Sequence, residues 1–173
     1  MSRRPQGGWV MKDDRLFILD VSLIGGPMTE AFLEQNPVVS RTMELRGDQT
    51  LQQLHYAIFA AFDREDEHMY EFQIGGTEPN DPDARRYVLP ALADGMVEDD
   101  EKPDGYVLST TLGSLDLDED ETFFYWFDFG DSWWHEIMVM AIQENAPGED
   151  YPRLTERVGE SPPQYPDWDE EEA

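Results

Sequence analysis

Two long runs of aromatic and apolar residues, separated by a short turn, are the strongest constraint on how this chain folds. The first run is TFFYWFDF (residues 122–129) and the second is WWHEIMVMAI (residues 133–142), with Gly130, Asp131 and Ser132 between them. Runs of this composition favour strands, and a short glycine-containing loop joins strands that run antiparallel. The sequence therefore predicts a long β-hairpin within a sheet that has a buried face.

The length of the hairpin loop decides which side chains share a face, because a shift of one residue turns every side chain over. A two-residue loop would combine Trp126, Asp128, Trp133 and His135 on one face. A three-residue loop (Gly130–Ser132) pairs Phe129 with Trp133 and Phe127 with His135, and it places Gly130 at positive φ. We favour the second loop because it separates an apolar face that also holds His135 from an outer face. The apolar face is Phe123, Tyr125, Phe127, Phe129, Trp133, Ile137 and Val139, and the outer face is Phe124, Trp126, Asp128, Trp134 and Glu136.

The rest of the chain supplies further strands and one clear helix. Strands are predicted for residues 15–25, 38–45 and 68–76, each of which ends at or near glycine. Thr50 and Gln53 form a capping box at the start of a helix over 50–62, and apolar residues follow at helical spacing. The predicted fold class is α+β: a mainly antiparallel sheet with a long C-terminal β-hairpin, packed against the capped helix (50–62).

The chain is most simply one domain with short tails. We expect a flexible N-terminal tail at 1–14, a single domain at 15–165 and an acidic tail at 166–173. Residues 77–109 contain four prolines and the polar run EDDEKPDG. This stretch predicts a polar insertion or lid within the domain.

The composition excludes several classes of protein. The chain has 173 residues, no cysteine, and 39 acidic against 12 basic residues, which gives a net charge of −27. Dispersed acidity of this kind is typical of proteins adapted to concentrated salt, and it opposes direct binding of a phosphate backbone. The longest apolar run has six residues (57–62), far short of the roughly 20 that span a bilayer. We expect a cytoplasmic protein that binds neither membrane nor nucleic acid directly.

Several motifs resemble the Ri-plasmid ORF-3-like family. They are LHYAIFAAF (54–62), DEHMYEF (66–72), TLGSL (111–115), FYWFDFGDSWWHEI (124–137) and YPRLTERVGESPPQYPD (151–167). The resemblance covers most of 15–165 and implies an α+β domain. Some members carry a resolvase-like label as passengers of insertion elements, and the family has no stated activity. This chain departs from the family at Asp63–Arg64, where a Trp is expected, and at Leu154 and Ser161, where relatives carry cysteines.

The three histidines of the chain all fall on these motifs and suggest a metal site. His55, His68 and His135, with an acid such as Asp128, offer the ligand types of a zinc or iron centre. Their wide separation gives no ligand spacing in the sequence, and each histidine is equally explained by individual packing. We therefore expect no cofactor, with a divalent transition metal as the alternative.

Two tryptophans on the outer face of the hairpin are the candidate contact residues. Trp126 and Trp134 lie beside acidic residues on that face, and adjacent exposed tryptophans are typical of interfaces. The alternative is that residues 77–109 cover them. The leading hypothesis is a non-catalytic binding or interaction module for an unknown protein or small-molecule partner, associated with plasmids or mobile elements. The alternatives are a metal-dependent enzyme that uses His55, His68 and His135, and a DNA recombination accessory, which the charge disfavours.

Overall fold

One mixed sheet forms the body of the protein. The computed structural model describes residues 12–90, 102–148 and 150–168, and in these residues eight strands lie in the order β5-β4-β3-β6-β7-β1-β2-β8. Neighbouring strands are antiparallel, except that β4 and β5 are parallel. The strands are β1 (Leu16–Gly25), β2 (Ser40–Arg46), β3 (Tyr70–Ile74), β4 (Arg85–Val88), β5 (Gly105–Tyr106), β6 (Thr122–Phe127), β7 (Trp133–Gln143) and β8 (Arg153–Val158).

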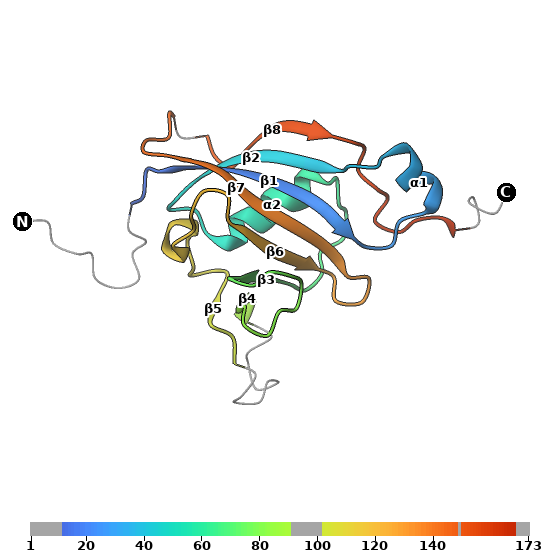
Figure 1. Ribbon diagram of the computed structural model, residues 1–173, viewed down its shortest axis with the longest axis horizontal. Helices are drawn as coiled ribbons and strands as arrows, with labels where there is room; N and C mark the ends of the chain where they lie inside the picture. The colour runs from blue at the N-terminus through green and yellow to red at the C-terminus, as the bar shows by residue number, and fades with distance from the viewer. Residues whose placement is uncertain (1–11, 91–101, 149, 169–173) are drawn as a thin grey trace, which may run out of the picture.

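The helix α2 (Leu51–Ala61) covers one face of this sheet, which we call the inner face. β7 and β1 cross in front of α2 in Figure 1. The predicted capping box is confirmed: Thr50 Oγ1 accepts from the backbone of Gln53, and the Gln53 side chain accepts from the backbone of Thr50. Leu51, Leu54 and Ile58 of α2 are fully buried in one core with the inner-face residues of the strands. The predicted α+β fold class is therefore confirmed.

Two short helical segments complete the described structure. The six-residue α1 (Glu30–Gln35) follows β1, and the 3-10 turn η2 (Leu112–Leu115) precedes β6. Among the described residues, no helix has the length and hydrophobicity that a membrane span requires.

The β6–β7 hairpin confirms the predicted faces but not the predicted loop. Phe127 pairs with Trp133 and Tyr125 with His135, instead of the predicted pairs of Phe129 with Trp133 and Phe127 with His135. Five residues (128–132) therefore connect the strands, so Phe129 and Asp128 belong to the loop rather than to the apolar and outer faces. Positive φ occurs at Asp128 (62°) and Ser132 (57°), and the expectation for Gly130 is wrong. The physical reason is that the Asp128 carboxylate accepts the backbone N–H groups of Gly130 and Asp131 and organises the turn itself.

The stretch 77–109 contributes strands to the sheet edge, which the sequence did not indicate. β4 and β5 lie in it, while residues 91–101 fall outside the described residues. Val107 is fully buried, and its carbonyl accepts the backbone N–H of Gln52 at the start of α2. The described ends of the expected insertion are therefore integral parts of the fold.

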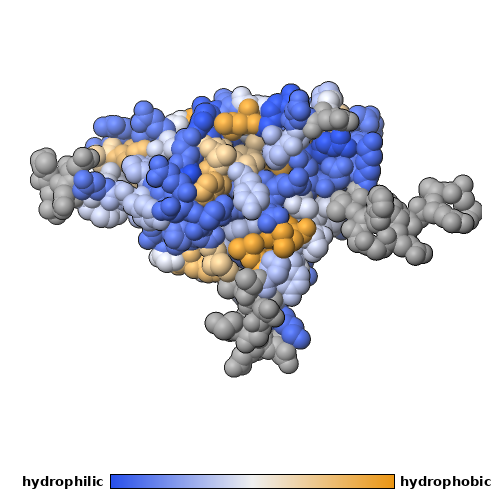
Figure 2. All heavy atoms as spheres, turned by 180° about the vertical axis from the view of Figure 1, so that it is seen from behind, coloured by the Kyte–Doolittle hydropathy of each residue, from blue (hydrophilic) through white to orange (hydrophobic). Residues whose placement is uncertain are grey.

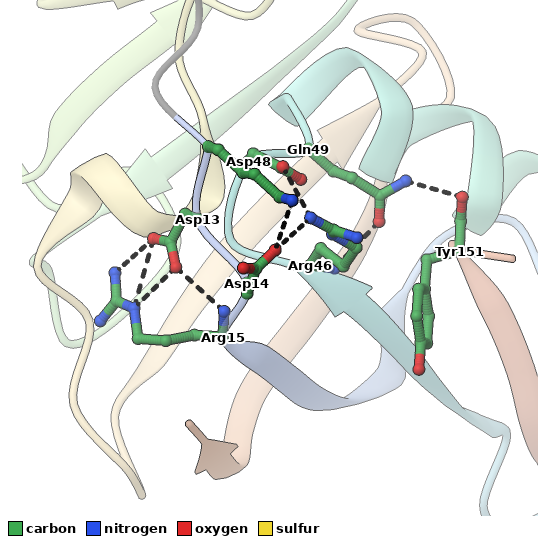
Figure 3. A network of polar contacts seen from close by, with 8 residues as sticks. Asp13, Asp14, Arg15, Arg46, Asp48, Gln49 and Tyr151 are labelled. Atoms are coloured by element: carbon green, nitrogen blue, oxygen red, sulfur yellow. Dashed lines mark hydrogen bonds and ion pairs between the residues drawn. The ribbon is translucent and has the colours of Figure 1, made fainter. Parts of the chain in front are cut away.

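Charged side chains fix the start of β1 against the turn between β2 and α2 (Figure 3). Arg46 forms ion pairs with Asp14 and Asp48, and Arg15 donates to both carboxylate oxygens of Asp13. The Gln49 side chain donates to the carbonyl of Tyr151, which joins the segment before β8 to the same corner. At this corner, Arg15 and Arg46 thus neutralise the acidic residues that lie next to them.

Candidate functional site

His55 lies on the buried side of α2 and contacts a tyrosine of the hairpin. Its Nδ1 is 2.5 Å from the Tyr125 hydroxyl, and its Nε2 is 3.0 Å from a carboxylate oxygen of Glu67. The ring stacks on Tyr70 with centroids 3.7 Å apart. Burial lowers the pKa of His55, although the nearby Glu67 carboxylate acts in the opposite direction. His55 is therefore a neutral core residue at neutral pH.

His135 is fully buried on β7, on the other side of Tyr125. Its Nδ1 is 3.2 Å from the Tyr125 carbonyl, and its Nε2 is 3.0 Å from the Arg64 guanidinium. Burial, together with the charge of Arg64, holds the pKa of His135 well below its ordinary value. A neutral ring with its proton on Nδ1 satisfies both contacts, because the guanidinium can only donate.

Arg64 is itself buried, among aromatic rings. Its guanidinium carbon lies about 5 Å from the ring centroids of Phe62, Phe127 and Trp133. Burial lowers the pKa of Arg64 to about 10, so the side chain remains charged at neutral pH. This arginine occupies one of the positions at which the chain departs from the family motif, and its cation–π contacts explain why a charge is tolerated there.

His68 belongs to a different cluster at the hairpin loop. Its Nε2 lies 2.9 Å from the Tyr165 hydroxyl and 3.5 Å from the Asp128 carboxylate. The expected metal ligands are thus divided between the core, with His55 and His135, and the loop, with His68 and Asp128. No group of three or more His, Asp or Glu side chains in the described residues is arranged to hold a metal ion. The metal site remains a prediction without a matching ligand geometry.

The two candidate contact residues stack on each other on the outer face of the hairpin. Trp126 and Trp134 have ring centroids 5.1 Å apart and planes within 5°. Both are half-buried, the Trp126 indole N–H donates to Ser132 Oγ, and Phe129 packs against Trp126. The pair therefore forms a rigid aromatic platform, which sequence reasoning located correctly on the outer face.

Beyond this platform, the outer face of the central strands remains open. Met138 and Met140 of β7 are 38% and 49% exposed, respectively. Across from them on β1, Asp20 pairs with Met138 and Ser22 pairs with Glu136. We call this surface the open face; it comprises Ile18, Asp20, Ser22, Trp134, Glu136, Met138 and Met140. Sequence reasoning missed the methionines, although their alternation with Ile137 and Val139 places them on the side of Trp134.

A polar cleft of about 270 Å³ borders the platform on the side of β3. The Glu71 carboxylate is buried there, and it accepts from Arg86 through two nitrogens and from the side-chain amide of Gln73. Asn80, from the loop between β3 and β4, closes the network through Gln73. Sequence reasoning gave no sign of this cleft, because its charges come from two strands that only the fold brings together. The acid in this cleft is neutralised from within the protein.

Comparison with known proteins identifies a family and a fold. The profile of plasmid pRiA4b ORF-3-like proteins matches residues 31–165. The crystal structure of the protein of unknown function MM3350 from Methanosarcina mazei Go1 has the same fold, with a TM-score of 0.62 and 23% sequence identity over 84% of this chain and 71% of that chain. No protein with a curated description matches the chain. Since the matched segment spans most of the described sheet, including the hairpin, the chain belongs to the plasmid pRiA4b ORF-3-like protein family.

Proposed function

We propose that the protein is a non-catalytic interaction module that docks a protein partner on the open face. The observation that carries this proposal is the exposure of Met138 and Met140 on β7, in the middle of the sheet and on the same face as the stacked tryptophans. A central strand is normally covered on both faces or presents polar residues to water. Tryptophan is enriched among residues that dominate binding energy, and methionine adapts its shape to a partner.

The opposite side of the molecule offers less for a partner to bind. Figure 2, which views the molecule from behind, shows a mainly hydrophilic surface with hydrophobic patches over its middle and lower part. Exposed apolar residues such as Tyr56, Leu108 and Leu154 lie on α2, in the turn after β5 and on β8, and single exposed apolar residues are normal on protein surfaces. The open face combines apolar exposure with a rigid aromatic platform, and this combination favours it as the docking surface.

The burial of two histidines supports binding over catalysis. His135 is fully buried, His55 is 1% exposed, and each uses both ring nitrogens in contacts within the protein. A catalytic acid or base must come within hydrogen-bonding distance of its substrate. Neither ring reaches solvent in the folded protein, so both act as core residues in this proposal.

We further infer that the module works in a salt-rich cytoplasm. The chain has no cysteine, and its net charge of −27 favours solubility in concentrated salt.

Selection from a random-peptide library displayed on phage tests the docking surface. Peptides selected on the wild type are titrated against the double variant Met138→Thr/Met140→Thr, whose threonines keep the strand and remove the apolar contacts. The matched control is Leu108→Thr/Leu154→Thr, which removes two residues of similar exposure (49% and 39%) from other surfaces. Circular dichroism confirms that each variant is folded.

The expected result is an affinity at least about tenfold weaker for the methionine variant and nearly unchanged for the control. A tenfold loss of affinity corresponds to about 1.4 kcal/mol of binding free energy, which is less than the roughly 2 kcal/mol lost when a hot-spot residue is removed. If selection yields no binders, or if the selected peptides bind both variants equally well, the open face is not the docking surface.

A further inference from the structure

We infer that the open face takes a cationic amphipathic partner, in which lysine or arginine residues are interspersed with apolar ones. This inference rests on the proposed function, and it adds the charge of the partner. It comes from the carboxylates that lie among the apolar residues of the face and from the shortage of cations around them.

Carboxylates occupy neighbouring positions across β7, β1, β2 and β8 on the outer face. Asp20 of β1 pairs with Met138 on one side and with Thr42 on the other. Glu136 and Glu44 lie two residues from these partners and are therefore diagonal neighbours of Asp20 on the same face. Glu156 of β8 pairs with Thr42 and extends the series toward the sheet edge.

These carboxylates receive little neutralisation from the protein. Glu44 is 3.6 Å from Arg153, whereas in the described residues no ion pair involves Asp20, Glu136 or Glu156. The Asp20 carboxylate accepts a hydrogen bond from Ser22 Oγ at 3.2 Å, which does not neutralise its charge. Like charges at diagonal positions of adjacent strands repel, so this face carries an electrostatic cost that a partner can remove.

Arg153 reaches the edge of this series at Glu44, and no other cation in the described residues forms an ion pair with these carboxylates. Each described cation already has a partner within the protein, as Figure 3 shows for Arg15 and Arg46. The others are Lys12, Arg41, Arg64, Arg85, Arg86, Lys102, Arg153 and Arg157. As far as the described residues go, dissolved cations or a basic partner are left to neutralise Asp20, Glu136 and Glu156 on this face.

The apolar residues between the carboxylates favour the basic partner over dissolved ions. Lysine and arginine can lay their aliphatic stems along Met138 and Met140 while their charged ends reach Asp20 and Glu136. Dissolved cations would neutralise the acids and leave both methionines in water. The cleft at Glu71 shows the contrast, since there the carboxylate already has its own arginine.

A pair of synthetic peptides tests the inference directly. In one peptide lysine and valine alternate, and in the other every lysine is replaced by glutamine. Binding of each is measured by calorimetry, from low to molar potassium chloride, to the wild type and to Asp20→Asn/Glu136→Gln. The matched control is Glu34→Gln/Glu160→Gln, which changes the net charge equally through exposed acids away from the face.

The lysine peptide is expected to bind the wild type and the control alike, to bind the face variant roughly tenfold more weakly, and to lose affinity as salt rises. The glutamine peptide is expected to bind far more weakly. Equal binding of the lysine peptide to both charge variants would mean attraction to the net charge alone, and equal binding of the two peptides to the wild type would mean that charge is not recognised. Either result overturns this inference. Selected peptides that depend on Met138 and Met140 but lack lysine and arginine would also overturn it while leaving the proposed docking surface intact.

Discussion

Tyr125 explains how a hydrophobic core can hold two histidines. Its hydroxyl contacts His55, its carbonyl accepts from His135, and its ring lies between the two imidazoles. Buried polar groups are stable only when they are hydrogen-bonded, and this one residue supplies a partner to each ring. Burial raises the pKa of the Tyr125 hydroxyl well above its ordinary value, so it stays protonated and can donate to His55.

The lowered pKa values of His55 and His135 predict a loss of stability in mild acid. An unfolded histidine takes up a proton near pH 6.5, whereas these buried rings resist protonation, so the unfolded state binds more protons below that pH. The two neutral rings therefore make their full contribution to the free energy of unfolding above about pH 6.5. Below that pH the free energy of unfolding falls by up to about 1.4 kcal/mol per pH unit for each ring, until the pH reaches the pKa of the folded state.

Thermal melts between pH 8 and pH 5 measure this effect. The melting temperature of the wild type is expected to fall below about pH 6.5, and that of His135→Gln to fall less steeply. Glutamine retains an acceptor for Arg64, so this variant is expected to fold. His68→Gln, which removes a histidine outside the buried pair, is the control. Parallel curves for the wild type and His135→Gln would contradict the assignment of His135 as a buried neutral ring.

At the scale of elements, the periodicity of the sequence predicts the amphipathic helix and strands. It misses a strand that forms only through its contacts with other elements. The helix α2 and strands β1, β2, β3, β6 and β7 have apolar patterns that their own sequences reveal. β8 has no such pattern, because all six of its residues are exposed. It is a strand because it pairs with β2 and because Arg157 donates to the Ala61 carbonyl at the end of α2. Contacts of this kind cannot be found from local sequence.

Gly26, which follows β1, and Gly130, in the hairpin loop, differ in how closely other residues pack against them. Gly26 has φ +143°, and a Cβ there would lie 2.3 Å from the Trp133 ring. A Cβ on Gly130 would meet nothing closer than 3.4 Å. Gly26→Ala is therefore expected to lower the free energy of unfolding by about 2 kcal/mol or more, and Gly130→Ala by less than about 1 kcal/mol. Urea denaturation measures both, and an equal effect of the two changes would contradict the close packing of Gly26 on Trp133.

At the scale of the whole molecule, the net charge predicts that salt stabilises the fold. At a net charge of −27 most acidic residues repel one another. Salt limits the range of this repulsion to about 8 Å near physiological ionic strength and to less at higher salt. The melting temperature is expected to rise from low to molar potassium chloride. Chloride is chosen over sulfate because sulfate also strengthens apolar burial. A flat or falling melting temperature would show that the acids are neutralised within the fold.

Only part of the candidate site could be predicted, because strand alternation can be read from the sequence whereas the pairing of strands cannot. The alternation of the hairpin placed Trp126 and Trp134 on the outer face, because strand geometry fixes the side on which each residue lies. The composition gave the net charge but not which acids lack a cation. Glu71 pairs with Arg86, whereas Asp20 has no cationic partner among the described residues. This difference arises from strand pairing across the sheet.

The strand order also has a consequence for synthesis on the ribosome. β6 and β7 lie between β3 and β1, so they join two parts of the sheet that are made much earlier. Until residues 122–143 leave the exit tunnel, β1 lacks its partner β7 and β3 lacks its partner β6. Unpaired edges with apolar side chains are targets for misassembly during translation. The hairpin covers both of these edges when it pairs, and β8, made last, then adds to the free side of β2.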